Sequence, residues 1–433
     1  MVNRLLLILL SLVLALPSSA SADTRTGMLN ERIRSLQVRL DGNADAPPVI
    51  VLNTPDRLIF SFDHLGDDRV YLRYELIHCN ADWQPSTLVD SEFLDGFNQG
   101  TIDDYAFSEV TTVHYVNYRL TIPNEQVAPR ISGNYLLRVY PEDDPDDTWL
   151  QCRFMVSEQS ARISARLSGV TDVDYNDAHQ QLSVEVDTER ADVADPFNDV
   201  TVMIQQNGRY DSEVALRQPL RMASRNVSVY EHQAPLIFEA GNEYRRFEAA
   251  STTYPGMGVE EIAWADPYYH VMLATDRPRA DAMYLYDETR AGRFAIREYN
   301  AADSDVEADY VVVHFSLDAP EMPGSLVFLD GDFTCRRFDD SALMSYNRAT
   351  GRYEHVALLK QGQYNYQYLV VPPGSTRGHT APIEGDRFQT QNEYLIKVYT
   401  RRPGDRADRL IAVTLLGTQT AKRFAIGKEP SGL

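Results

Sequence analysis

Large apolar side chains stand at every second position in many short segments of this chain, and this period of two leaves few folds open to it. The segments 134–140 and 311–317 show the alternation, and 364–370 places three tyrosines on one face and an asparagine and a glutamine on the other. Successive side chains of a strand point to opposite faces of a sheet, whereas helical positions repeat every 3.6 residues. The pattern therefore predicts β-strands in these segments.

Turn-forming residues separate the predicted strands. Clusters of Asp, Asn, Gly and Pro recur at spacings of roughly 8 to 12 residues, as is typical of antiparallel β-proteins. The pair Asn207 and Gly208 follows an alternating segment at 200–206 and predicts a hairpin turn. With 433 residues the chain is long enough for two or three domains. We expect an all-β fold of tandem Ig-like β-sandwich domains with mainly antiparallel strands.

Changes in composition along the chain suggest its domain boundaries. An acidic turn at 142–147 lies between two closing strands of a first sandwich, and a loop-rich stretch at 252–279 precedes the last one. The expected parts are a signal peptide at 1–22, an N-terminal β-sandwich at 23–158, a second β-sandwich at 159–280, a C-terminal Ig-like β-sandwich at 281–417 and a tail at 418–433.

The N-terminus has the features of a secretory signal peptide. Arg4 precedes an apolar run at 5–16, and the small residues Ala20, Ser21 and Ala22 follow. The run is shorter than the ~20 residues that a membrane-spanning helix needs, and small residues at this place suit a signal peptidase. We expect cleavage near Ala22, a mature chain in the periplasm, and no direct insertion of that chain into a membrane.

The charge of the chain limits its partners. It carries 63 acidic and 41 basic residues, which gives a formal net charge of −22. This negative field repels nucleic acid and anionic lipid, so neither is an expected partner, whereas a cationic surface is compatible with it. The few lysines fit a halophilic source and an arginine-rich, GC-biased genome equally well. Three cysteines are too few for a disulfide framework, so burial must hold the fold.

The sequence offers no set of residues typical of a catalytic or metal site. His78 and Cys79 are neighbours on a predicted strand, so they point to opposite faces, and no second pair stands at zinc-finger spacing. The acidic segment 172–177 resembles the start of a calcium-binding loop, but Asp177 and Ser183 occupy the positions that need glycine and glutamate. The chain contains no Gly-x-Ser-x-Gly motif. We therefore expect no enzyme activity, no cofactor and no metal.

Two turns combine an aromatic residue with turn formers, at 82–86 and at 94–97. In one interpretation, Trp83 and Phe97 fold back onto the sandwich. In the other, they project from their loops as anchors for a protein partner, because aromatic residues dominate the energetics of interfaces. The sequence does not separate the two, and Trp83 and Phe97 are the predicted partner-binding residues.

These turns also carry a family resemblance. The string His-Cys-Asn-Ala-Asp-Trp at 78–83, followed by Leu-Asp-Gly-Phe at 94–97 and by the segments 118–125 and 131–136, resembles the N-terminal domain of the type IX secretion system plug family. Further segments are similar to later parts of that family, at 174–180, 206–210, 241–247, 331–333, 364–368 and 384–388. Tyr210 stands where the family pattern has Trp, and Asp386 where it has Asn.

The resemblance implies an all-β, non-enzymatic periplasmic protein. Such a protein would bind the periplasmic mouth of the giant outer-membrane translocon barrel of this secretion system and close it while no cargo passes. An alternative is a periplasmic carbohydrate-binding protein, because 327–333 is similar to the opening of glycogen-binding Ig-like modules, although an expected Trp is missing near Cys335. A third alternative, an outer-membrane barrel, is disfavoured because charges such as Arg138 and Lys397 interrupt the strands.

Overall fold

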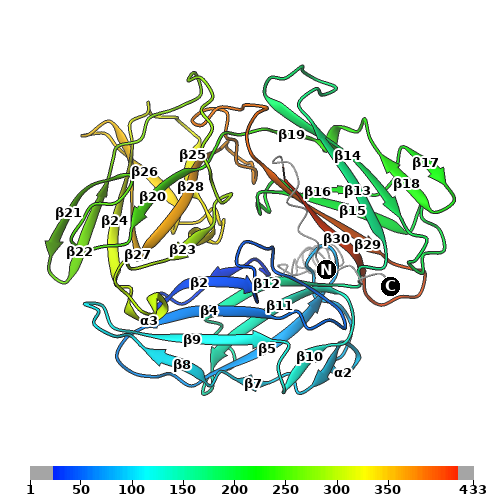
Figure 1. Ribbon diagram of the computed structural model, residues 1–433, viewed down its shortest axis with the longest axis horizontal. Helices are drawn as coiled ribbons and strands as arrows, with labels where there is room; N and C mark the ends of the chain where they lie inside the picture. The colour runs from blue at the N-terminus through cyan, green and yellow to red at the C-terminus, as the bar shows by residue number, and fades with distance from the viewer. Residues whose placement is uncertain (1–22, 418–433) are drawn as a thin grey trace, which may run out of the picture.

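Nearly all of the regular secondary structure is β-strand, in a computed structural model that describes residues 23–417. The expected signal peptide and tail lie outside the described residues. Figure 1 shows three lobes arranged around a common centre: lobe 1 at the bottom, lobe 2 at the upper right and lobe 3 at the upper left. The all-β fold with mainly antiparallel strands is confirmed. No helix within residues 23–417 is long and apolar enough to cross a bilayer.

Lobe 1 is a sandwich of two sheets. One sheet has the order β1 (Gly27–Met28), β12 (Leu150–Ser157), β11 (Gly133–Pro141), β5 (Leu72–Cys79) and β7 (Gly100–Thr101), with β3 (Val49–Val51) parallel to β12. The other has the order β2 (Ile33–Leu40), β4 (Leu58–Leu65), β9 (Tyr115–Ile122) and β8 (Asp104–Phe107). Beside them lie the short helix α2 (Asp90–Phe93) and the pair β6 (Leu94–Gly96) and β10 (Val127–Pro129).

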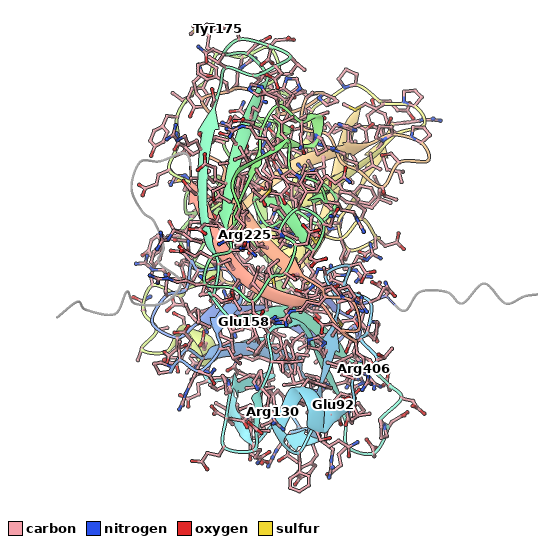
Figure 2. All side chains as sticks on the ribbon, turned by 90° about the vertical axis from the view of Figure 1, so that its right-hand side faces the viewer. Glu92, Arg130, Glu158, Tyr175, Arg225 and Arg406 are labelled. Atoms are coloured by element: carbon pink, nitrogen blue, oxygen red, sulfur yellow. The ribbon has the colours of Figure 1, made fainter. Side chains whose placement is uncertain are left out.

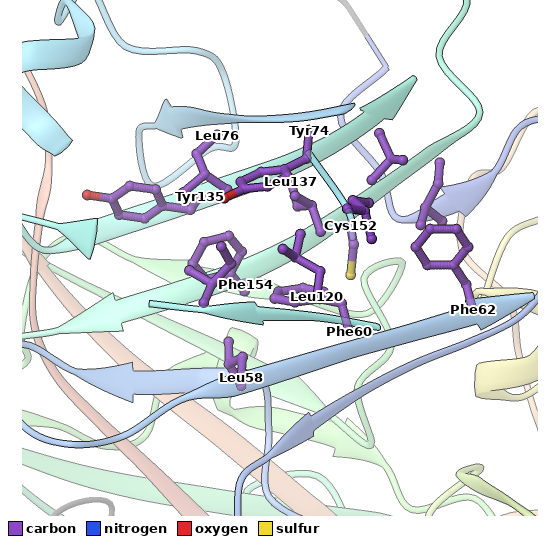
Figure 3. Close-up of a cluster of buried hydrophobic side chains, with 14 of the residues drawn as sticks. Leu58, Phe60, Phe62, Tyr74, Leu76, Leu120, Tyr135, Leu137, Cys152 and Phe154 are labelled. Carbon is purple, nitrogen blue, oxygen red and sulfur yellow. The ribbon is translucent and has the colours of Figure 1, made fainter. Parts of the chain in front are cut away.

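Alternate residues of these strands meet between the two sheets. Phe60 of β4 lies edge-on to Phe154 of β12, with ring centroids 5.6 Å apart, and Tyr135 of β11 stacks on the same Phe154 at 5.3 Å (Figure 3). All three side chains are buried. The period of two seen in the sequence thus directs one face of each sheet into a shared core, and burial of this kind stabilises a fold by about 1.5–3 kcal/mol per large apolar side chain.

Lobe 2 is also a sandwich, and the end of the chain returns to complete it. Its first sheet has the order β13 (Arg162–Ser168), β14 (His179–Asp187), β18 (Val227–Tyr230) and β17 (Arg221–Ser224), with β19 (Ile237–Glu239), which follows η1 (Ala234–Leu236), also on β14. Its second sheet has the order β16 (Val214–Leu216), β15 (Val200–Gln206), β29 (Glu393–Thr400) and β30 (Arg409–Gly417).

Lobe 3 is one strongly curled sheet. Its order is β20 (Arg245–Ala249), β28 (Gly362–Val371), β25 (Leu326–Asp330), β26 (Leu343–Asn347), β27 (Arg352–Lys360), β24 (Tyr310–Leu317), β22 (Tyr268–Leu273) and β21 (Val259–Ala265), with β23 (Phe294–Ile296) on β28. The curl brings Phe247 of β20 edge-on to Phe315 of β24, with centroids 5.6 Å apart. Two short helices, α3 (Ser304–Glu307) and η2 (Asp332–Thr334), lie in its loops.

The sheets do not follow the boundary that we expected at residue 280. Strands β20 to β22 precede that boundary but lie in the sheet of lobe 3, and β29 and β30 follow it but lie in lobe 2. β29 lies between two lobes because its side chains are buried on both faces. Ile396 and Val398 pack in the core of lobe 2, whereas Leu395 and Tyr399 face lobe 1. The last residue of β12 is Ser157, and the expected boundary at 158 lies next to it.

Candidate interaction surfaces and lobe junctions

The turn after β5 carries Trp83 inward. The Trp83 backbone has φ 64°, and its N–H donates to the carbonyl oxygen of Asn80 at 2.9 Å. The indole is 4% exposed and packs in a cluster that joins lobe 1 to β29 and β30, where Leu410 and Val413 are among its members. The expectation that Trp83 projects from the surface is therefore corrected: it lies at a junction between lobes and is not a free contact residue.

Arg153 is held between two aromatic rings at the same junction. Its guanidinium carbon lies 4.4 Å from the ring centroid of Trp83 in lobe 1 and 4.8 Å from that of Tyr210 in lobe 2. Its Nε donates to the carbonyl oxygen of Thr24 at 2.7 Å. Burial lowers the pKa of Arg153, but a guanidinium keeps its charge at neutral pH. The cation–π contacts, which are worth about 2 kcal/mol when desolvated, tie lobe 1 to lobe 2.

An exposed ion pair adds to this junction. Arg406 in the β29–β30 connection pairs with Glu92 of α2 at 2.7 Å, and Figure 2 places both near the lower end of the molecule. The Glu92 carboxylate also accepts the N–H of Val89, which caps the helix. Exposed pairs contribute about 0–1 kcal/mol, so the apolar cluster around Trp83 carries most of the contact.

The other predicted contact residue, Phe97, points outward. Gly96 has φ 100°, and a Cβ at this position would lie 1.9 Å from the carbonyl oxygen of Gln126, so the turn requires glycine. The N–H of Phe97 donates to that same oxygen at 3.2 Å. The phenyl ring is 86% exposed. The Leu-Asp-Gly-Phe motif thus fixes a backbone that holds an apolar ring in solvent, and the role of Phe97 in partner binding stays a prediction.

A buried ion pair joins lobe 1 to lobe 3. Lys360 Nζ at the end of β27 lies 2.7 Å from Asp63 Oδ2 in β4, and both side chains are almost fully buried. Tyr310 donates its hydroxyl to the same oxygen at 2.6 Å, and Asn117 donates to Asp63 Oδ1 at 2.7 Å. Burial and the adjacent carboxylate raise the pKa of Tyr310, so its hydroxyl remains a donor. The carboxylate is thus fully partnered, as a buried charge must be.

Two chain segments cross between lobes 2 and 3 and bind each other. One runs from β19 to β20 and the other from β28 to β29. The N–H of Arg387 donates to the carbonyl oxygen of Gly241 at 2.8 Å, and Asp386 accepts the N–H of Gly241 at 2.9 Å. Burial raises the pKa of Asp386, and the nearby carboxylate of Glu239 adds to the rise. These bonds fix the route by which the chain leaves lobe 2 and returns to it.

Glu384 anchors the returning segment to lobe 3. The carboxylate is fully buried and accepts from Arg245 Nε at 3.0 Å and from Arg279 Nη2 at 2.7 Å. Burial alone would raise the pKa of Glu384, but the two arginines bring it below its ordinary value. The carboxylate therefore stays ionised and bridges the start of β20 to the loop after β22.

A cavity of about 250 Å³ lies where the three lobes meet. Its arginines are Arg39, Arg153, Arg290, Arg293 and Arg336. Arg290 of lobe 3 pairs with Asp45 of lobe 1 at 2.5 Å, and Arg293 of lobe 3 pairs with Glu393 of lobe 2 at 2.6 Å. These two ion pairs join lobe 3 to lobes 1 and 2, so the cavity wall has a structural role.

The polar loops and thiols singled out in the sequence have structural partners or are buried. Asp174 accepts from Thr171 Oγ1 and pairs with His179 Nδ1, each at 2.7 Å, as turn chemistry requires. Among residues 23–417, no group of three or more His, Cys, Asp or Glu side chains is placed to hold a metal. The three cysteines are free, and burial raises the pKa of Cys79 to about 12, which keeps its thiol protonated.

The segment behind the carbohydrate alternative is buried. Phe328 and Phe333 lie in the interior of lobe 3, so neither ring is presented for stacking on a sugar. Cys335, which replaces the expected Trp, lies at the central cavity. No observation therefore favours that alternative.

The sequence did not identify the residues that join the lobes. Lys360 and Asp63 are 297 positions apart, and no local motif marks either of them. The scarcity of lysine could have indicated the buried ion pairs. Lys360 and Lys397 are both buried, and each is paired with a carboxylate. A lysine retained in a predicted strand of a lysine-poor chain is a candidate for such a role.

Comparisons with known proteins agree with the fold and with the motifs of lobe 1. The family model of the type 9 secretion system plug protein 1st domain matches residues 33–158. The crystal structure of a hypothetical protein from Parabacteroides merdae is similar over 91% of this chain and 99% of that one, with 43% identity and a TM-score of 0.90. An alkylpurine DNA glycosylase from Pseudomonas fluorescens reaches a TM-score of 0.16 at 10% identity, over 29% of this chain and 30% of its own, which is no likeness of fold. No curated protein matches the chain.

Proposed function

This chain belongs to the type 9 secretion system plug protein family, and we propose that it is a non-enzymatic periplasmic plug. It binds the periplasmic mouth of the outer-membrane translocon barrel of this system and closes it when no cargo passes. The observation that carries the proposal is the family match over residues 33–158, the lobe that contains the motifs at 78–83 and 94–97.

The construction of the body supports this role. A plug must resist deformation, because a barrel wide enough for folded cargo would leak through any gap. Each pair of lobes is joined by buried contacts: the Trp83 cluster, the Lys360–Asp63 pair, and the crossing segments that Glu384 anchors. Such a body closes an opening by shape, and a specific interface of this kind buries upwards of about 1,200 Å².

The surface charge suggests how the plug approaches. With a net charge of −22, the chain is attracted to a basic rim, and the attraction acts over the Debye length of about 8–10 Å at moderate salt. Added salt should therefore weaken docking. Phe97 is the proposed apolar anchor on lobe 1, because it is exposed and held by a fixed turn.

Affinity capture tests the proposal directly. Tagged mature protein is incubated with detergent-solubilised outer membranes, and the eluate is probed for the translocon barrel. Retention of the barrel, weakened by added salt, supports the plug. Retention on immobilised glucan, with no barrel in the eluate, would instead support a carbohydrate-binding protein.

A further inference from the structure

An extended segment between β22 and β23 holds apolar side chains out in solvent. Met283 is 94% exposed and Leu285 is 80% exposed, whereas Tyr284 between them turns inward. The hydroxyl of Tyr284 donates to Glu243 Oε1 at 2.6 Å. Over residues 283–285, the outer two side chains thus project from the body and the middle one anchors the segment to it.

The segment is fixed on both sides of these residues. Arg387 Nη2 donates to the carbonyl oxygens of Ala280 at 2.6 Å and Ala282 at 2.8 Å. On the far side, Asp287 pairs with Arg246 at 2.7 Å. Ordering of loops costs affinity when it happens during binding, so a segment ordered beforehand is suited to binding.

A second loop, at 170–177 in lobe 2, is bonded to the same short stretch of chain as Tyr284. It exposes Val173 and Tyr175, the latter by 75%. The N–H of Phe388 donates to the carbonyl oxygen of Asp177 at 2.9 Å, and the hydroxyl of Tyr284 lies 3.2 Å from the carbonyl oxygen of the next residue, Gln389. The two loops are therefore neighbours across one short stretch of chain. Figure 2 places Tyr175 at the end of the molecule opposite Glu92 and Arg130 of lobe 1.

Carboxylates lie on the same two loops as these apolar side chains. Asp172, Asp177, Asp281 and Glu288 are all exposed on the two loops. Exposed apolar groups within a polar rim mark interaction sites, and acidic side chains at the rim select a basic partner. The same carboxylates repel anionic lipid, which disfavours a membrane as the occupant.

We propose that loops 170–177 and 281–288, with Val173, Tyr175, Met283 and Leu285 as the apolar contacts, form a docking surface for a protein that offers an apolar pocket edged by basic side chains. This paired-loop surface rests on the proposed function, in which the partner is the periplasmic mouth of the translocon barrel. It is separate from Phe97, which lies on lobe 1.

The test compares serine substitutions on and off the surface. Met283→Ser with Leu285→Ser, and Tyr175→Ser alone, are assayed for capture of the solubilised barrel, with Leu220→Ser and Leu326→Ser as controls at other exposed apolar positions of lobes 2 and 3. We expect the double substitution to weaken capture by at least about tenfold, as loss of an interface hot spot does. The controls should bind as the wild type does, and all variants should keep its melting temperature.

Charge variants test whether the partner is basic, and lipid vesicles test whether the surface binds a membrane instead. Asp281→Asn with Glu288→Gln should flatten the salt dependence of capture if the rim contacts basic groups. Equal capture by wild type and loop variants overturns the paired-loop surface while leaving the proposed function in place. Failure of the wild type to retain the barrel overturns both. Loop-dependent binding to vesicles of phosphatidylethanolamine and phosphatidylglycerol would overturn the protein partner and would show that the surface binds a membrane.

Discussion

Replacement of Lys360 by Met tests whether the buried ion pair fixes lobe 3 on lobe 1. In the wild type, Lys360 Nζ lies 2.7 Å from the Asp63 carboxylate, and neither side chain reaches solvent to any extent. Met keeps most of the side-chain length but leaves the carboxylate buried without its cation. Loss of one partner from such a pair costs about 3–5 kcal/mol, because the remaining charge has no compensation. The hydrogen bonds from Tyr310 and Asn117 persist and favour the lower end of this range.

This cost translates into a measurable melting shift. For residues 23–417, an unfolding entropy of about 2.1 cal/mol/K per residue amounts to roughly 0.8 kcal/mol/K, so a loss of about 3–5 kcal/mol lowers Tm by about 4–6 °C. Differential scanning calorimetry measures it. Arg348→Met is the control, because it breaks the exposed Arg348–Glu321 pair and should change Tm by less than about 1 °C.

A second substitution separates loss of the pair from loss of packing. Adding Asp63→Asn to Lys360→Met removes the orphaned charge and should recover part of the lost stability, so the two substitutions should not be additive. A Tm for Lys360→Met within about 1 °C of the wild type would refute the reasoning, as would strict additivity.

Four further substitutions test individual features. Trp83→Ala should destabilise the protein by about 3–5 kcal/mol in urea unfolding, whereas the exposed Phe97→Ala should leave the unfolding midpoint unchanged and weaken only capture of the barrel. Gly96→Ala should lower Tm, because its Cβ would collide with Gln126; an unchanged Tm would show that the turn can shift. Since Asp386 has a raised pKa in the folded state, stability falls as pH rises from the unfolded to the folded pKa. Asp386→Asn should therefore raise Tm at about pH 7.5, and the gain should vanish below about pH 4, which a pH series of melting curves would check.

The sequence predicted local structure well, because local structure depends on periodicity. The tyrosine alternation at 364–370 is β28, and the apolar alternation at 311–317 is most of β24. Periodicity identifies a strand but not its sheet. The strand β29 is buried on both faces, and nothing in its own residues indicates that it pairs with β15.

The directions of Trp83 and Phe97 show the same limit. Both stand in predicted turns. The backbone at Gly96 requires glycine, whereas Trp83 itself adopts a positive φ of 64° that favours glycine. Trp83 is buried because Leu410 and Val413, more than 300 positions later, cover it. Phe97 has no such cover. The exposed residues Met283 and Leu285 could not be separated from core residues in the sequence, because their exposure depends on the inward anchor of Tyr284.

Leakage from cells that lack the protein tests the plug most directly. A large periplasmic reporter protein and a secreted cargo of the type IX system are measured in the medium of deletion and complemented strains. Loss of a closing subunit removes the seal and spares the conduit, so we predict that the reporter escapes while cargo secretion continues, and that the wild-type protein restores retention. A deletion strain that keeps the reporter inside and stops secreting cargo would contradict the plug, because the protein would then act in transport itself.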